Sequence, residues 1–241
     1  MNRVALITGA SRGIGRSIAL AFARHGYSIG INFARSKDKA EAVAREIGSL
    51  GGKSLLLEAD VSNSEQVKKM VGKVMGEWGK IDVLVNNAGI TRDRTILKMS
   101  DEEWLETIQV NLTGAFWCLR ECAKEMCRKK EGAILNISSI VGAKGSSGNA
   151  NYVASKAGLM GLTKAAAREL GRFNVRVNSL LPGFHRTDMG NRVWDKLFER
   201  VRSEHFLGKL TDLEEFAEFV CVVAEQKSVS GQVYNFDSRI L

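Results

Sequence analysis

A glycine-rich turn between an apolar run and a helical segment is the feature that most constrains the fold of this chain. Residues 4–8 (VALIT) form a short run rich in branched apolar residues, as expected for a buried parallel strand. The turn 9–15 has the spacing GxxxGxG and leads into residues 16–24, where apolar residues recur at helical spacing. Glycines admit positive φ, and a helix N-terminus directs free N–H groups at a phosphate. This segment therefore predicts a phosphate-binding βα unit.

The rest of the chain continues the alternation of strands and helices. We expect further strands at 27–32, 53–59, 81–85, 132–138, 175–180 and 231–237. We expect helices at 37–50, 64–78, 101–127, 151–170 and 211–224, with acidic residues at the start of 101–127 and Thr211 as the N-cap of the last. Such alternation predicts an α/β fold, one doubly wound parallel sheet with helices on both faces, and a single domain over 1–241.

A second constellation carries the candidate chemistry. Tyr152 and Lys156 are four residues apart, so a helix would project them from one face. A neighbouring ammonium stabilises phenolate and lowers the pKa of a tyrosine toward the range useful for acid–base catalysis. Ser139 lies thirteen residues upstream of the tyrosine and offers a hydroxyl to a carbonyl oxygen on which charge develops. The alternative is that the pair has no catalytic role, because an ordinary amphipathic helix with an exposed Tyr and Lys would show the same spacing.

The candidate residues follow the carboxyl ends of the expected strands, where ligands bind in open α/β sheets. The glycine-rich turn follows the first strand, Asp60 the third, Asn86 the fourth, Ser139 the fifth and Pro182 the sixth.

These motifs together resemble one family. The segments TGASRGIG (8–15), DV (60–61), NNAG (86–89) and PG (182–183), with Asn111, Ser139, Tyr152 and Lys156, occur in the order and spacing of the short-chain dehydrogenases/reductases. The resemblance covers essentially the whole chain and implies a Rossmann-like fold. Segments 89–93, 101–104 and 110–114 are most similar to the 3-oxoacyl-[acyl-carrier-protein] reductases and the acetoacetyl-CoA reductases.

The resemblance implies NADPH-dependent reduction of a 3-oxoacyl thioester, carried on acyl carrier protein or CoA. Tyr152 would protonate the carbonyl oxygen, Ser139 would hydrogen-bond it, and Lys156 would hold the nicotinamide ribose. Asn111 would anchor a water that links Lys156 to solvent, and no metal is required. A reductase or dehydrogenase acting on another ketone, alcohol or quinone is the alternative. A catalytically idle subunit ranks last, because Tyr152, Lys156 and Ser139 are all present.

The cofactor prediction comes from the end of the second expected strand. NAD-dependent enzymes commonly carry an acidic residue there for the ribose 2′-hydroxyl, but this chain has Asn32 followed by Arg35 and Ser36. Arg35, Ser36 and Arg12 are suited to a 2′-phosphate, which favours NADPH. The alternative for Arg35 is that it only decorates the start of a helix.

The resemblance also implies the remaining cofactor residues. They are Gly9, Ser11, Gly13, Ile14 and Gly15 in the turn, Asp60 and Val61 at the adenine, Asn87, Ala88 and Gly89 at the adenosine ribose, Tyr152 and Lys156, and Pro182, Gly183 and Thr187 at the carboxamide.

The chain is basic, with a formal net charge of +8 and a pI near 9.4. It has no nucleic-acid-binding motif and its basic residues are spread along the sequence, so we expect no nucleic acid partner. The densest basic cluster consists of Lys124, Arg128, Lys129, Lys130 and Arg172. This cluster either docks an acidic acyl carrier protein or is a solvated helix end.

Cellular context and assembly follow from the remaining features. No apolar run reaches membrane-spanning length, no signal peptide precedes the first strand, and the four cysteines lack the spacing of a zinc site. We therefore expect a cytoplasmic protein with reduced thiols in the helix core or a subunit interface. The helices at 101–127 and 151–170 carry many small and apolar residues and, by resemblance, pair across a two-fold axis in a homotetramer.

Three segments depart from the family pattern. His185 and Arg186 follow Pro182–Phe184, and the histidine is expected at the surface unless it faces the nicotinamide and tunes substrate choice. The C-terminal segment 235–239 lacks the VDGG-like end of the family. The segment 192–208, which by resemblance covers the substrate, matches no one specificity class.

Overall fold

Seven parallel strands form one sheet in the part of the chain that the structure, a computed structural model, describes: residues 3–185 and 202–239. The strand order is β3-β2-β1-β4-β5-β6-β7. The strands are β1 (Val4–Ile7), β2 (Ser28–Phe33), β3 (Ser54–Glu58), β4 (Val83–Asn86), β5 (Gly132–Ile137), β6 (Val175–Leu181) and β7 (Val233–Asn235). Each lies within one to two residues of its expected bounds.

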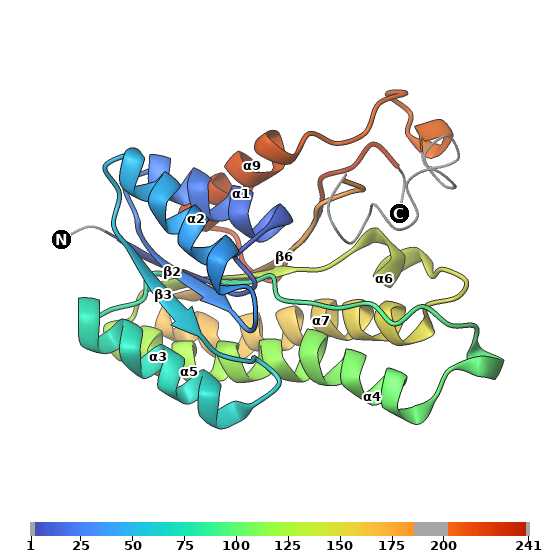
Figure 1. Ribbon diagram of the computed structural model, residues 1–241, viewed down its shortest axis with the longest axis horizontal. Coiled ribbons are helices and arrows are strands. Elements are labelled where there is room, and N and C mark those ends of the chain that lie inside the picture. Colours follow the sequence, from blue (N-terminus) through green and yellow to red (C-terminus); the bar gives the residue numbers. More distant parts are fainter. Residues whose placement is uncertain (1–2, 186–201, 240–241) are drawn as a thin grey trace.

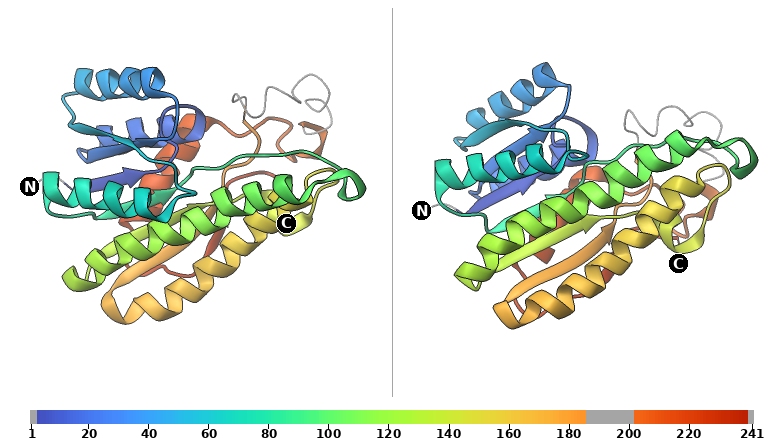
Figure 2. Two further views of the ribbon diagram at one scale, coloured as in Figure 1. Left: turned by 60° about the horizontal axis from the view of Figure 1, so that its bottom comes forward. Right: turned by 90° about the horizontal axis from the view of Figure 1, so that it is seen from below.

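Helices cover both faces of this sheet (Figures 1 and 2). One face packs against α1 (Gly13–Arg24), α2 (Lys37–Ser49) and α9 (Leu213–Glu225). The other packs against α3 (Ser64–Trp78), α5 (Gly114–Lys129) and α7 (Ala150–Leu170). Strand β1 shows how the sequence supplies both cores, since Ala5 and Ile7 point to the first and Val4 and Leu6 to the second. The expected doubly wound α/β fold is confirmed.

The strand order reverses between β1 and β4, and this reversal positions the candidate site. From β1 the chain winds outward to β3, and from β4 it winds outward in the opposite direction to β7. Ile7 is paired with Val85, and Thr8 N donates to Val85 O at 3.0 Å. The turns that follow these two strands therefore lie side by side at the carboxyl edge of the sheet, at a topological switch point.

The helices between β4 and β6 differ from expectation in two ways. The expected helix at 101–127 is α4 (Asp101–Ile108), a π-helical turn (Gln109–Thr113) and α5 in succession, and it begins with a Ser100–Glu103 capping box. The short helix α6 (Ile140–Lys144) was not expected.

Thr211 as the N-cap of α9 was wrong. Asp212 is the cap, because its carboxylate accepts hydrogen bonds from Glu214 N (2.8 Å) and Glu215 N (2.9 Å). The Thr211 hydroxyl instead donates to Phe236 O at 3.3 Å.

The cysteines are thiols, and Cys118, Cys122 and Cys221 are buried in the helix core, as expected. No helix among residues 3–185 and 202–239 combines the length and the apolar character needed to cross a membrane.

Candidate active site

The glycine-rich turn after β1 brings the main chain close to any ligand at the start of α1. Gly9 (φ 64°) and Gly13 (φ 54°) both have positive φ. A Cβ on Gly15 would lie 2.3 Å from the Gly9 carbonyl oxygen and 2.5 Å from Asn87 Nδ2, so only glycine fits there. No side chain caps α1, and its first turn contains no acidic residue. The first N–H groups of the helix are thus directed at a site suited to an anion.

Polar side chains hold this turn against the one that follows β4. Thr8 Oγ1 accepts hydrogen bonds from Asn87 N (2.9 Å) and Ala88 N (3.0 Å), and Asn87 Nδ2 donates to Thr8 O (2.9 Å) and Gly9 O (3.1 Å). Asn32 is 2% exposed; its Oδ1 accepts from Gly9 N (3.2 Å) while Nδ2 donates to two carbonyls at the end of β3. The side chains of Asn87 and Asn32 therefore position the turns.

The groups expected near the adenosine half lie at the same edge. Arg12, directly before α1, and Arg35, two residues after β2, are exposed. Ser36 is the N-cap position of α2 and makes no side-chain capping bond. Asp60 is fixed after β3, because its Oδ1 accepts from Ser62 N (2.9 Å) and Ser62 Oγ (2.7 Å).

The hydroxyls of Ser139 and Tyr152 meet beside Lys156. Ser139 ends the segment after β5 and its side chain hydrogen-bonds the phenol of Tyr152 on α7. Lys156 Nζ lies 5.6 Å from the Tyr152 ring centroid and donates to Ile137 O at 2.7 Å. The adjacent Ser138 points elsewhere, since its hydroxyl donates to Lys156 O at 2.8 Å and so joins β5 to α7.

The pKa of Tyr152 differs from the sequence-based expectation. Burial raises this pKa to about 12, the hydrogen bond from Ser139 opposes the rise only in part, and the charge of Asp93 adds to it. Burial also lowers the pKa of Lys156 to about 8. Desolvation, the largest of these causes, shifts the pKa of Tyr152 upward, whereas the sequence analysis expected the Lys156 ammonium to lower it; that effect of Lys156 stays a prediction. The phenol is therefore protonated at neutral pH, which is the form a proton donor requires.

Asn111 lies at the centre of the π-helical turn between α4 and α5. It is 1% exposed, and its Oδ1 accepts from Ile90 N at 2.8 Å while Nδ2 donates to Ile90 O (3.0 Å) and Ser155 Oγ (3.1 Å). A Cβ on Gly89 would lie 3.3 Å from Asn111 Oδ1 and 3.7 Å from Lys156 Nζ. Asn111, Gly89 and Lys156 thus converge, and π-helical turns occur frequently at functional sites.

The loop after β6 completes this edge. Gly183 has φ 84°. His185 is 7% exposed, its Nε2 lies 2.5 Å from Pro182 O, and its ring centroid lies 6.0 Å from that of Phe216. Burial lowers its pKa. The surface interpretation of His185 was wrong, because the side chain packs into the core below the loop.

Thr187 and Arg186 lie outside the described residues, as does most of the segment 192–208.

Several residues that shape the site carry little signal in the sequence. Gly142 allows α6 to touch α7, since a Cβ there would lie 2.8 Å from the backbone carbonyl carbon of Lys156. Gly114 likewise lets α5 approach the loop after β3, where its Cβ would lie 2.8 Å from Val61 O. Ser155 accepts a hydrogen bond from Asn111, and Ser138 donates one to the carbonyl of Lys156. No pattern in the sequence indicates these two bonds.

The basic cluster lies at the other edge of the sheet. Lys124 and Arg128 pair with glutamates of their own helix, at 2.7 Å and 2.6 Å, and Lys129 Nζ donates to the carbonyl that ends α3 at 2.8 Å. Lys130 lies two residues before β5, and the Arg172 guanidinium lies 4.8 Å from the ring centroid of its neighbour, Phe173.

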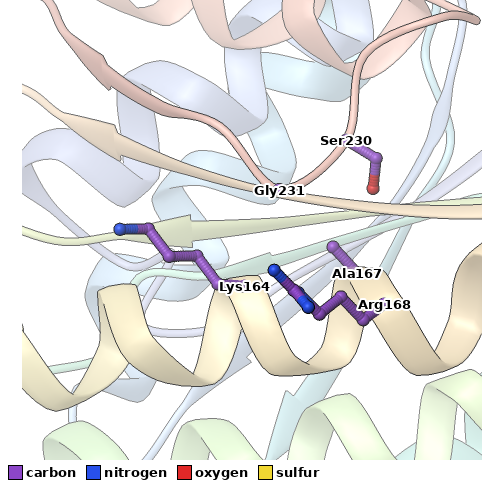
Figure 3. Close-up of a pocket in the computed structure, with 5 residues that line it drawn as sticks. All are labelled: Lys164, Ala167, Arg168, Ser230 and Gly231. Atoms are coloured by element: carbon purple, nitrogen blue, oxygen red, sulfur yellow. The ribbon is translucent and has the colours of Figure 1, made fainter.

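A hollow of about 340 Å³ lies on the outer side of α7, lined by Lys164, Ala167, Arg168, Ser230 and Gly231 (Figure 3). It contains none of the site residues described above.

This structure combines three features: a doubly wound parallel sheet, a glycine-rich turn after its first strand, and a Ser–Tyr–Lys group. Together they define a class of dinucleotide-binding protein. A family model described as short chain dehydrogenase matches residues 3–197, and the chain belongs to this family.

Particular relatives narrow the comparison. The chain is 46% identical over 234 residues to the 3-oxoacyl-[acyl-carrier-protein] reductase FabG of Staphylococcus epidermidis, covering 96% of each chain. It is 39% identical over 240 residues to the 3-oxoacyl-[acyl-carrier-protein] reductase of Synechocystis sp., covering 99% of this chain and 97% of the relative. Among solved structures, a variant of actinorhodin polyketide ketoreductase with NADPH superposes with a TM-score of 0.92 at 31% identity, covering 97% of this chain and 95% of that one.

Proposed function

We propose that this protein is an NADPH-dependent reductase that converts a 3-oxoacyl thioester into the 3-hydroxyacyl thioester. The observation that carries the proposal is the meeting of the Ser139 and Tyr152 hydroxyls beside Lys156 at the carboxyl edge of the sheet. The 46% identity to FabG over 96% of the chain supports the 3-oxoacyl substrate.

The residues present fit a phosphorylated dinucleotide. The turn around Gly9 and Gly15 leaves no room for side chains and directs main-chain N–H groups outward. Arg12, Arg35 and Ser36 would bind the 2′-phosphate, since all three lie beyond β1 and β2 and no carboxylate ends β2. NADPH supplies the hydride when bound.

The side chains of the site would manage the proton and the developing charge. Tyr152 Oη would donate its proton to the substrate carbonyl oxygen, and Ser139 Oγ would hydrogen-bond the same oxygen. Lys156, with a pKa of about 8, is mostly charged at neutral pH and would stabilise the phenolate left behind. Asn111 would hold the water that connects Lys156 to solvent.

Other carbonyl substrates are the alternative, favoured by the fold shared with a polyketide ketoreductase. The test follows oxidation of NADPH with acetoacetyl-carrier protein, acetoacetyl-CoA, a simple ketone and a quinone, and reduction of NADP⁺ with an alcohol. We expect turnover with the two thioesters to exceed that with the others. If neither thioester is reduced but a ketone or quinone is, the 3-oxoacyl assignment fails.

The proposal includes a partner, an assembly and a location. The carrier of the thioester would be an acidic acyl carrier protein, and the enzyme would be a cytoplasmic homotetramer. Exposed apolar side chains around α4 and α5 support the assembly: Ile96, Leu97, Trp104, Leu105 and Phe116.

A further inference from the structure

A buried charged cluster ties together the segment before α9 and the C-terminal tail. The side chains of His205 and Asp237 are fully buried, and that of Arg239 is 9% exposed. His205 Nε2 lies 3.1 Å from Asp237 Oδ1, and Arg239 Nε donates to Asp237 Oδ2 at 2.9 Å. Burial raises the pKa of Asp237, but hydrogen bonds and charge from Arg239 outweigh it, so the carboxylate is ionised at neutral pH.

The tail after β7 is closed around this carboxylate. Arg239 N donates to Asp237 Oδ1 at 2.8 Å, and Asn235 Nδ2 donates to Arg239 O at the same distance. Phe206 N donates to Ser238 O at 3.4 Å, which adds a main-chain link to the segment before α9. Burying an ionised carboxylate is costly unless it is paired, so its removal from such a cluster disturbs every group that it holds.

The same carboxylate lies close to the loop that follows β6. A Cβ on Gly183 would lie 3.2 Å from Asp237 Oδ2 and 2.4 Å from Thr211 Oγ1. Phe236, the neighbour of Asp237, donates through its N–H to Leu181 O at 3.0 Å and accepts from Thr211 Oγ1 at 3.3 Å. Three chain segments therefore meet at Asp237: the end of β6, the start of α9 and the tail.

Because Asp237 is fully buried, it acts through its neighbours rather than by touching a ligand. We propose that Asp237, held by Arg239 and close to His205, is a positioning residue that keeps the Pro182–Gly183 loop in the conformation that receives the nicotinamide half of the cofactor. The inference rests on the proposed function, because the family resemblance behind that function assigns Pro182 and Gly183 to the carboxamide of the nicotinamide.

The test compares two ligands in Asp237→Asn. NADPH carries the nicotinamide, whereas adenosine 2′,5′-bisphosphate carries only the adenosine half with its 2′-phosphate. Without the carboxylate the Pro182–Gly183 loop should leave this conformation, so the Kd of NADPH should rise roughly tenfold, which corresponds to about 1.4 kcal/mol. The Kd of adenosine 2′,5′-bisphosphate should stay at the wild-type value, because its expected contacts lie at the opposite half of the site. Both are measured by calorimetric titration.

Two further variants keep the test decisive. Asp212→Asn removes a carboxylate from the same region but preserves an N-cap residue, and should bind both ligands as wild type does. His205→Gln breaks one side of the cluster, and should weaken NADPH alone, by a smaller factor.

Unchanged NADPH affinity in both Asp237→Asn and His205→Gln would overturn the inference, as would equal weakening of both ligands, which indicates a general folding role. Failure of the wild-type protein to bind NADPH would overturn the proposed function itself, which is a separate result.

Discussion

At the residue scale, burial and hydrogen bonding set the chemical state of the site. Lys156 is 4% exposed and Nζ is held by Ile137 O at 2.7 Å, so its position is fixed while its pKa falls to about 8. Desolvation raises the pKa of Tyr152, in contrast, to about 12. Burial thus disfavours the charged form of both groups, which keeps the phenol protonated before the proton is transferred.

Replacing Tyr152 by Phe removes the proton donor with almost no change in volume. Turnover in thioester reduction should fall by roughly two to four orders of magnitude. NADPH affinity should remain near the wild-type value, because phenylalanine keeps the ring and lacks only the hydroxyl that donates the proton. Single-turnover kinetics and a fluorescence titration measure the two quantities. Tyr234→Phe, on β7, is the matched control and should leave turnover unchanged; near-normal turnover in Tyr152→Phe would contradict the mechanism.

The proposed contacts to the 2′-phosphate of NADPH are tested at the two exposed arginines beyond β1 and β2. Arg12→Ala or Arg35→Ala should raise the KM for NADPH much more than that for NADH, because only NADPH carries the 2′-phosphate. Each lost charge-assisted contact should cost about 1.5–3 kcal/mol. Arg45→Ala, which removes an exposed charge from the body of α2, should change neither KM. Equal effects on both cofactors would show that these arginines do not meet the phosphate.

At the scale of elements, the periodicity of apolar residues predicted nearly all of the fold. The reason is that the buried face of each strand and helix is encoded by the spacing of apolar residues within that element. The failures lie where distant segments decide. Thr211 is a good N-cap residue by type, but its hydroxyl bonds the chain after β7 and Asp212 caps α9 instead. The order and spacing of the motifs also predicted that the candidate residues follow the strand ends, and in the structure they gather at that one edge of the sheet. The burial of His185 and the pairing of His205 with Asp237 depend on contacts between segments far apart in sequence, so no local pattern could indicate them.

The contact between α6 and α7 sets the position of Ser139 relative to Tyr152. Gly142→Ala would place a Cβ 2.8 Å from the backbone of Lys156, which the backbone can accommodate only by moving α6. We expect a loss of about 1–3 kcal/mol in the free energy of unfolding, together with reduced turnover. Thermal unfolding and steady-state kinetics measure both.

Gly76→Ala in α3 is the matched control for this substitution. A Cβ there meets nothing within 4 Å, so the variant should be as stable as wild type or more so and fully active. Wild-type stability and turnover in Gly142→Ala would show that the approach of the two helices is unimportant.

At the scale of the whole molecule, apolar side chains remain uncovered on the side of α4 and α5. Leu105 is 62% exposed and Phe116 is 39% exposed, and α4, α5 and α7 lie together on one side of the molecule (Figure 2). A symmetric interface between copies would bury them. Light scattering at micromolar concentration should give the mass of a tetramer, or at least a dimer, of the 26.4 kDa chain.

A variant that places charge on this surface tests the interface directly. Leu105→Glu with Phe116→Glu should lower the mass, whereas Leu50→Glu, at an exposed apolar residue outside it, should not. A wild-type mass near that of one chain would contradict the assembly.

The proposed docking of a carrier protein is tested at the basic cluster. Lys130 lies two residues before β5 and Ser139 lies two residues after it, so the basic cluster and the candidate active site lie at opposite edges of the sheet, about 20 Å apart along the strand. A carrier protein bound at the cluster would therefore have to present its thioester to Tyr152 across that distance. Lys130→Glu with Arg172→Glu should impair reduction of acetoacetyl-carrier protein while sparing acetoacetyl-CoA, because Tyr152 and its partners are untouched.

The electrostatic origin of this effect has its own signature. Attraction between the cluster and an acidic carrier is screened by salt, so raising the ionic strength should shrink the difference between wild type and variant. Lys53→Glu with Lys227→Glu makes the same change in net charge at exposed sites outside the cluster and should reduce both substrates normally. If the cluster variant loses activity on both thioesters alike, the basic residues stabilise the fold or the assembly and do not recognise the carrier.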